Sequence, residues 1–292
     1  MSLALPNTPP APFQIGIKPL DPRQWIEVDA LLPAYLNEKA RLEAVAFPQV
    51  FMAEPDTEAA QHEVLTQLVA HLLERYPDVY RQAGTTIEIL PAGRRVDLAD
   101  AAVPPLQRAA RLVQEDLVLM RRGPEHWRLA AASLSFPSSW VLAEKFGRPM
   151  HEVHGPVPGF GGGTRNAGLI ERMFDNCRPE TPMIRWNWSL FGDDRLFHPE
   201  AGHPDRPRFA DGAWLRLERQ TFTRLPVSGD LLFSIRIGLR PVESLAADPE
   251  GPAIARTLLR QLEGLNDTQL AYKGLLADHT LLRQMLARLA GA

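Results

Sequence analysis

Residues 184–190 read Ile-Arg-Trp-Asn-Trp-Ser-Leu, an alternation of apolar and polar side chains. A second stretch, residues 231–240, has the same period, with Leu, Phe, Ile, Ile and Leu at every other position. Successive side chains of a β-strand point to opposite sides, so each stretch predicts a strand with one apolar and one polar face. These two strands decide the fold class, because they predict an antiparallel sheet around which the rest of the chain must pack.

Further strands precede each of these two. Residues 214–225 predict a strand that carries Arg216 and Glu218 on one face and Arg219 on the other, and the turn at 226–229 leads into the last strand. Charge on both faces of a sheet strand is unusual. Earlier in the chain, residues 115–120 and 127–136 predict a hairpin, because Arg-Arg-Gly-Pro at 121–124 is good turn chemistry.

Helical periodicity dominates the two ends of the chain. Asp21 and Pro22 predict an N-cap and first position for a helix that runs through residues 24–45, and residues 57–74 and 105–113 predict two more. The first hundred residues are therefore expected to be mainly helical. Short helices are predicted at 149–155 and 168–176, and the tail predicts helices at 253–265 and 268–289.

The order of these elements predicts an α+β fold. It contains a five-stranded antiparallel sheet with short helices inserted after the second strand, which resembles the order of a PAS-type domain. We expect residues 1–104 to form a helical N-terminal extension, 105–245 the PAS-like domain and 246–292 C-terminal helices packed on it. Such sheets hold ligands between their concave face and the inserted helices, although fold order alone assigns no function.

Composition excludes several classes of protein. The 292 residues include 32 Lys and Arg against 35 Asp and Glu, too few cations for a general nucleic-acid binder. The single cysteine, Cys177, rules out an internal disulfide framework and a multi-cysteine metal site. No stretch approaches the roughly 20 apolar residues of a membrane-spanning helix, and the N-terminus lacks a signal-peptide pattern. We therefore expect a cytoplasmic protein without a membrane partner.

The most suggestive histidines lie in residues 149–159, Pro-Met-His-Glu-Val-His-Gly-Pro-Val-Pro-Gly. His151 and His154 are three residues apart on a predicted helix, so both imidazoles can project toward one region. His154 is favoured as an axial haem ligand, because it stands at the helix end among valines and the following Gly-Pro bends the chain away. The plainer interpretation is a capping or core histidine. A His-x-x-His metal pair is a weaker hypothesis, since it lacks a third ligand.

A glycine-rich loop follows these histidines. Gly161–Gly163 precede a helix that carries Arg165 near its start, an arrangement that attracts phosphates or carboxylates, such as haem propionates. A flexible loop is the plainer interpretation. Cys177 is a poor candidate for a thiolate ligand, because its neighbours are typical of a polar helix end.

Glu218 is the best candidate for a polar group inside an apolar site. An ionised carboxylate there needs a cation, which an ammonium substrate would provide. The alternative is an exposed cross-strand ion pair with an arginine. Trp186 and Phe233 are simply interpreted as core residues, and they would serve equally well as walls of a haem pocket. The chain lacks the Gly-x-Ser-x-Gly, Gly-x-Gly-x-x-Gly and His-Glu-x-x-His motifs of hydrolases, dinucleotide-binding proteins and zinc proteases.

Several separated motifs, in order, resemble the haem-dependent oxidative N-demethylase alpha-subunit family. They are Trp-Arg-Leu at 127–129, Ser-Phe-Pro-Ser-Ser-Trp at 135–140, Glu-Lys-Phe-Gly-Arg-Pro at 144–149, Val-His-Gly-Pro-Val-Pro-Gly at 153–159, Arg-Trp-Asn-Trp at 185–188, Leu-Glu-Arg-Gln-Thr at 217–221, Arg-Leu-Pro at 224–226, Phe-Ser-Ile-Arg at 233–236 and Ala-Tyr-Lys-Gly at 271–274. The similarity extends from near Pro19 to the tail, and members of the family resemble a haem-binding PAS-like domain with helical additions.

The resemblance implies haem b, dioxygen and oxidation of a small N-methylated amine, such as dimethylamine, with release of formaldehyde. It implies electrons from NADPH through separate flavin and iron–sulfur subunits, and it suggests transfer of formaldehyde to tetrahydrofolate. Carried over by motif, His154 is the axial ligand and Glu218 the partner of the substrate amine. The alternative is a non-catalytic PAS-like haem or small-ligand sensor, and a third hypothesis is a haem-free member with a structural role.

Overall fold

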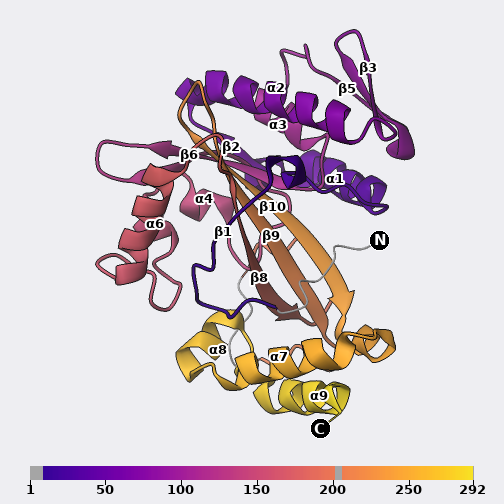
Figure 1. The fold of residues 1–292 in the computed structure, drawn as a ribbon, viewed down its shortest axis with the longest axis vertical. Coiled ribbons are helices and arrows are strands. Elements are labelled where there is room, and N and C mark those ends of the chain that lie inside the picture. Colours follow the sequence, from indigo (N-terminus) through magenta and orange to yellow (C-terminus); the bar gives the residue numbers. More distant parts are fainter. Residues whose placement is uncertain (1–8, 201–205, 292) are drawn as a thin grey trace.

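The computed structural model describes residues 9–200 and 206–291, and its centre is a mixed-length antiparallel sheet (Figure 1). Seven strands of the described residues form it, in the spatial order β1 (Lys18–Pro19), β8 (Met183–Phe191), β9 (Trp214–Arg224), β10 (Leu231–Pro241), β6 (Asp116–Arg122), β7 (Trp127–Ser133) and β2 (Phe51–Ala53). The α+β class predicted from the sequence is confirmed. The sheet is wider than the five strands expected, because the short strands β1 and β2 pair at its two edges.

The register of the long strands assigns each side chain to one face of the sheet. Glu218 of β9 pairs with Asn187 of β8 and with Ile237 of β10, so these three side chains share a face. The neighbouring residue, Arg219, pairs with Trp186 and Arg236 and points to the opposite face. The alternation read from the sequence therefore holds across three adjacent strands.

The two faces are covered by different helices. Glu218's face packs against α4 (Leu142–Lys145), α5 (Met150–Val153) and α6 (Arg165–Asn176), which supply apolar side chains such as Phe160 and Phe174 in and beside them. The opposite face is covered at one end by α2 (Glu58–Arg75) and α3 (Pro105–Ala110), and at the other by the C-terminal helices. Helix α1 (Leu32–Val50) contributes to the cores on both sides.

The N-terminal hundred residues are less helical than predicted. Asp21 does cap Pro22–Gln24, but this is the short 3-10 helix η1, and α1 begins only at Leu32 and runs on through Pro48. A separate three-stranded sheet follows α2, formed by β3 (Tyr80–Ala83), β4 (Thr86–Ile89) and β5 (Arg94–Asp97). These four-residue strands are too short and too charged to show a clear period of two, so the sequence pattern missed them.

The C-terminal helices are α7 (Gly251–Glu263), α8 (Asp267–Lys273) and α9 (His279–Ala290), grouped below the sheet in Figure 1. The single helix predicted over 268–289 is broken at Gly274, whose φ of +63° lies in the left-handed region that favours glycine. A side chain at this position would also collide with the guanidinium of Arg208, whose nearest atom is 2.6 Å from an ideal Cβ. The break turns α9 back against α7.

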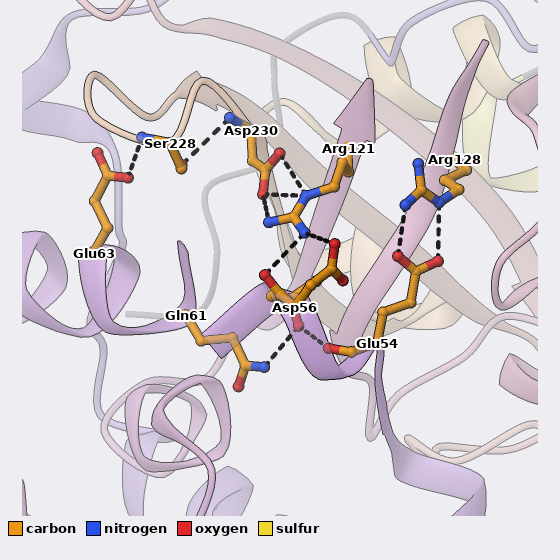
Figure 2. A network of polar contacts seen from close by, with 9 residues as sticks. Glu54, Asp56, Gln61, Glu63, Arg121, Arg128, Ser228 and Asp230 are labelled. Atoms are coloured by element: carbon orange, nitrogen blue, oxygen red, sulfur yellow. Dashed lines mark hydrogen bonds and ion pairs between the residues drawn. The ribbon is translucent and has the colours of Figure 1, made fainter. Parts of the chain in front are cut away.

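A network of ion pairs closes the end of the sheet next to α2 (Figure 2). Arg121 of β6 donates to Asp230 at 2.7 Å and lies 3.0 Å from Asp56 in η2 (Pro55–Thr57). Arg128 of β7 makes a two-pronged contact with Glu54 at 2.9 and 2.7 Å. These contacts join the β6–β7 hairpin to the segment that leads into α2, and so hold α2 against this end of the sheet.

Candidate functional site

Glu218 lies on β9, on the face that α4–α6 cover, and only 7% of it is exposed. Its carboxylate accepts hydrogen bonds from the Ser138 hydroxyl, from Gln220 Nε2 at 2.7 Å and from Asn187 Nδ2 at 3.4 Å. No cationic side chain of the described residues lies within 4.0 Å of it. The exposed cross-strand ion pair considered from the sequence is therefore absent in this part of the chain, and the buried carboxylate keeps neutral partners only.

Arg216 reaches Glu218 through Ser138. Its Nε donates to Ser138 Oγ at 2.9 Å and its Nη2 donates to the carbonyl of Phe136 at 2.8 Å, while its guanidinium lies 5.4 Å from the centroid of the Phe191 ring. The Ser138 hydroxyl thus accepts from the cation and donates to the carboxylate. This relay orients Glu218 without neutralising it by direct contact.

His154 ends α5, with its backbone N–H bonded to the carbonyl of Met150 at 3.0 Å. Its ring lies 6.3 Å from the ring of Phe160, and the side chain is partly buried. Burial lowers the pKa of His154 to about 4, and the positive charges of Arg185 and Lys145 lower it further in the same direction. The imidazole is therefore neutral at pH 7, with a ring nitrogen lone pair available to a metal.

Arg185 connects the histidine to the carboxylate. It lies on β8, two residues from Asn187 and thus on the face of Glu218, and its charge acts on His154. Burial lowers the pKa of the Arg185 guanidinium. The negative charge of Glu218 opposes this change, because it favours the cationic form. Arg185 is thus the residue whose charge acts on His154 and which is itself acted on by Glu218, 64 positions further along the chain than His154.

The other residues predicted for the site lie in different places. Phe233 stacks on Phe222 with ring centroids 4.7 Å apart, on the face of Glu218. Trp186 points to the opposite face and packs against the core of the C-terminal helices. Arg165 is exposed at the first position of α6, where Thr164 supplies the N-cap by accepting from Ala167 N at 3.2 Å.

The two histidines of the 149–159 stretch separate. The ring of His151 lies 4.6 Å from the ring of His126, whereas His154 contacts Phe160. Among the described residues, no group of three or more His, Cys, Asp and Glu side chains could hold a metal ion, so the His-x-x-His pair has no third ligand there. Cys177 is buried and packs in the core next to α6.

Sequence reasoning did not single out Ser138, Asn187, Gln220 or Arg185. Asn187 and Arg185 were detectable in principle, because they form the polar face of the stretch that decides the fold. Ser138 lies in a loop far from β9 in sequence, and only the folded chain brings its hydroxyl to Glu218.

A groove of about 270 Å³ lies elsewhere, between α1, β5 and the end of α3. It contains the cations Lys39, Arg94, Arg95 and Arg111, but two of them are paired, Arg111 with Glu43 and Arg95 with Glu88, each at 2.8 Å. None of the elements that line it carries His154 or Glu218. We therefore centre the candidate site on β8, β9 and α5.

A comparison with known protein families matches residues 16–281 to the haem-dependent oxidative N-demethylase, alpha subunit-like family. The chain belongs to this family. The match covers nearly the whole chain and confirms the resemblance found in the sequence motifs. Among residues 9–200 and 206–291, no helix has the length and apolar character that a membrane crossing requires.

Haem is the cofactor that the family's description names, and the side chains around His154 fit it. An axial ligand must present a neutral nitrogen, which the lowered pKa of His154 ensures. The ring of Phe160 lies 6.3 Å from that of His154, and Phe222 and Phe233 belong to the same hydrophobic cluster as Phe160. In addition, the Nε of Arg185 is buried without a hydrogen-bond partner among the described residues, as expected of a donor that awaits an anionic group.

Proposed function

We propose that this chain is the haem-binding subunit of an oxidative N-demethylase that acts on a small N-methylated amine, such as dimethylamine. The observation that carries the proposal is the grouping of a neutral His154, Arg185 and the buried Glu218 on one face of the sheet. Family membership supports the cofactor and the reaction class. We also propose that β6–β10 with α4–α6 form a PAS-like unit, because these five strands are adjacent and the helices lie between the second and third of them in sequence.

The net reaction inserts one oxygen atom of dioxygen into a C–H bond of the N-methyl group. Two electrons and two protons reduce the other oxygen atom to water, and the hydroxymethyl amine separates into the demethylated amine and formaldehyde. His154 would hold a haem b, which would supply the chemistry that activates dioxygen. The family resemblance implies electrons from NADPH through separate flavin and iron–sulfur subunits, and the single cysteine of this chain cannot itself hold an iron–sulfur cluster. Tetrahydrofolate is the proposed acceptor of formaldehyde.

The residues of this chain position the substrate. Glu218 receives the ammonium group, because a buried carboxylate without a contacting cation gains most from one. Ser138, Asn187 and Gln220 hold its two oxygens in one orientation, and the apolar side chains of the same face surround the methyl groups. The N-methyl carbon is thereby held at a fixed position relative to His154.

The test of the haem site replaces His154 by alanine, with His151→Ala as the matched control from the same helix. Wild type and His151→Ala should each bind about one haem per chain. Their Soret band should shift when the protein is reduced and carbon monoxide is added. His154→Ala should lose stoichiometric haem while keeping its circular dichroism spectrum. Unchanged haem content in His154→Ala would exclude this ligand assignment.

The test of catalysis supplies haem-loaded protein with a chemical reductant, dioxygen and dimethylamine. Formaldehyde release in proportion to the amine consumed supports the enzyme. Glu218→Gln should abolish the change that the amine causes in the haem spectrum, whereas the exposed control Glu180→Gln should retain it. A wild-type protein that binds haem and amine but releases no formaldehyde would instead be a non-catalytic binding protein.

A further inference from the structure

Two cations at the edge of β8, Arg185 and Lys273, lack the carboxylate contacts that Arg219 and Arg236 have on the other face of the sheet. Arg185 donates from Nη2 to the carbonyl of Gln14 at 3.1 Å, a neutral acceptor supplied by the N-terminal segment that crosses this face. Its Nε is buried and makes no hydrogen bond within residues 9–200 and 206–291. No carboxylate of those residues lies within 4.0 Å of its guanidinium. A planar guanidinium with a free, buried N–H is a strong donor without an acceptor.

Lys273, the last residue of α8, is the second cation. Its Nζ donates to the carbonyl of Trp188 at 2.7 Å and lies 5.2 Å from the Trp188 ring and 5.5 Å from the Phe13 ring. The pKa of Lys273 is lowered to about 8, mainly by burial. The negative charge of Glu218 opposes this change, and the positive charge of Arg185 adds to it. Phe13 is next in sequence to Gln14, whose carbonyl accepts from Arg185, so the same N-terminal segment contacts both cations.

Glu218 does not resolve this excess of positive charge. It is the one opposite charge of the described residues that acts on both cations, and its two oxygens are occupied by Ser138, Asn187 and Gln220. Arg216 draws on the same carboxylate through Ser138. Glu218 thus acts on all three cations without contacting any of them, while Asp116 and Asp193 act on Arg216 as well, so a further anion beside Arg185 and Lys273 would lower the energy of this pair.

We propose that Arg185 and Lys273 form a carboxylate-binding site at the edge of β8, where Arg185 lies on the face of Glu218 and Lys273 reaches the strand from α8. The guanidinium offers a fork that matches a carboxylate, and the ammonium group offers a second donor from the other side. Two ligands carry the required group: a propionate of the haem, or the carboxylate of an N-methylated amino acid whose ammonium group pairs with Glu218. The inference rests on the proposed function, because it assigns a ligand group to the same site.

Arg165 is the competing candidate for a propionate. It is exposed, and it follows a glycine-rich loop of which Gly162 and Gly163 are exposed as well. An exposed arginine keeps its hydration when no ligand is present, whereas the buried Nε of Arg185 has already lost its water. Arg185 therefore gains more from a carboxylate, and Arg165→Gln is the appropriate control variant.

The experiment uses the full chain with Arg185→Gln, Arg185→Lys, Lys273→Gln and the control Arg165→Gln, each checked for wild-type circular dichroism. The first measurement is the rate at which haem leaves the protein for a haem scavenger. The second is the thermal stabilisation produced by N-methylglycine and, separately, by dimethylammonium chloride, recorded on protein with and without haem. Arg185→Lys keeps the charge but not the fork, and it should recover part of the effect.

If a propionate occupies the site, Arg185→Gln should release haem about 10- to 100-fold faster, as expected for the loss of a charged contact of roughly 1.5–3 kcal/mol, and the amine responses should not change. If a substrate carboxylate occupies it, haem release should be unchanged, and the stabilisation by N-methylglycine should fall selectively. Wild-type rates and responses in both Arg185→Gln and Lys273→Gln would overturn the inference. Failure of the wild-type chain to bind haem would contradict the proposed function instead, and the N-methylglycine measurement on haem-free protein would still test the carboxylate site.

Discussion

The two faces of β9 and β10 carry buried charge in opposite ways. On the face toward η1, Arg236 lies 2.9 Å from Asp29 and over the ring of Tyr35, and Arg219 lies 2.8 Å from Glu27 and donates to the carbonyl of Trp25. On the face toward α5, Glu218 and Arg185 have neutral contacts only. We refer to Arg219 and Arg236 with their carboxylates as the closed face, and to Glu218 and Arg185, with Lys273 at the edge of β8, as the open face.

This difference separates charges that hold the fold from charges that await a ligand. When a buried cation contacts a carboxylate, removal of either partner leaves the other as an unpaired charge in the protein interior, and this lowers the stability of the fold. A buried charge without such a contact is unfavourable until a ligand of opposite charge binds to it. Proteins retain unfavourable arrangements of this kind at functional sites. The comparison predicts that closed-face variants lose stability, whereas open-face variants lose binding.

The largest expected effect is that of Arg236→Met. Arg236 is fully buried and Asp29 is 14% exposed at its side chain, so the variant leaves a shielded carboxylate without its cation. We expect the free energy of unfolding to fall by about 3 kcal/mol or more, measured by urea denaturation. Arg185→Gln is the matched comparison from the open face, and we expect it to change stability by less than about 1 kcal/mol. Equal losses in both variants would show that the two faces do not differ.

An ion pair that is less buried than Arg236–Asp29 should contribute less to the free energy of unfolding. Arg121 and Asp230 in the network of Figure 2 expose 18% and 5% of their side chains, and their closest atoms are 2.7 Å apart. We expect Arg121→Met to lower the free energy of unfolding by about 2 kcal/mol, between the values typical of surface and buried pairs. Haem content should remain that of the wild type, because Arg121 contacts Asp56 and Asp230 and neither His154 nor Glu218. A loss of haem with no loss of stability would reverse the distinction.

The pH dependence of stability should report His154. Its folded pKa of about 4 lies below the ordinary 6.5, so the folded state binds fewer protons than the unfolded state between these values. The stability that it contributes is present above pH 6.5 and is lost as pH falls toward 4. For this partly exposed side chain we expect only about 1 kcal/mol, after allowance for solvent screening.

The measurement compares His154→Gln with the wild type in urea at pH 7 and at pH 5. Other titrating groups cancel in the difference, and the variant should become more stable relative to the wild type at the lower pH. A difference for His154→Gln that is the same at both pH values would contradict a buried, neutral imidazole in the haem-free protein.

The sequence predicted much of the sheet and less of the site. The alternation over 184–190 and 231–240 identified β8 and β10, because one face of each packs on an apolar core and the other does not. The same alternation placed Glu218 and Arg219 on opposite faces. The strands β3–β5 were missed, because four-residue strands at the surface bury too little to impose a pattern.

The site could be predicted only where a motif carried it. His154 and Glu218 were selected through their local context and the family resemblance. Ser138 and Lys273 also lie in motifs of the family, but they were given no role, because they reach the site from a loop and from α8. No periodicity encodes such meetings, since they depend on how elements far apart in sequence pack together. Trp186 illustrates the converse, because its aromatic character suggested a pocket wall while the pleat of β8 directs it to the C-terminal helices.

The smallest expected change in stability is that of Glu218→Gln, and it is the sharpest test of the open face. The carboxylate is buried without a contacting cation, so its removal relieves a desolvation cost, while the glutamine amide can still accept the hydrogen bond from Ser138. Rotation of the amides of Asn187 and Gln220 can supply the remaining partners. We therefore expect the free energy of unfolding to change by less than about 1 kcal/mol, although amine binding is lost. A loss comparable to that of Arg236→Met would mean that Glu218 belongs with the residues that hold the fold, and the amine site would then have to be sought elsewhere on this face.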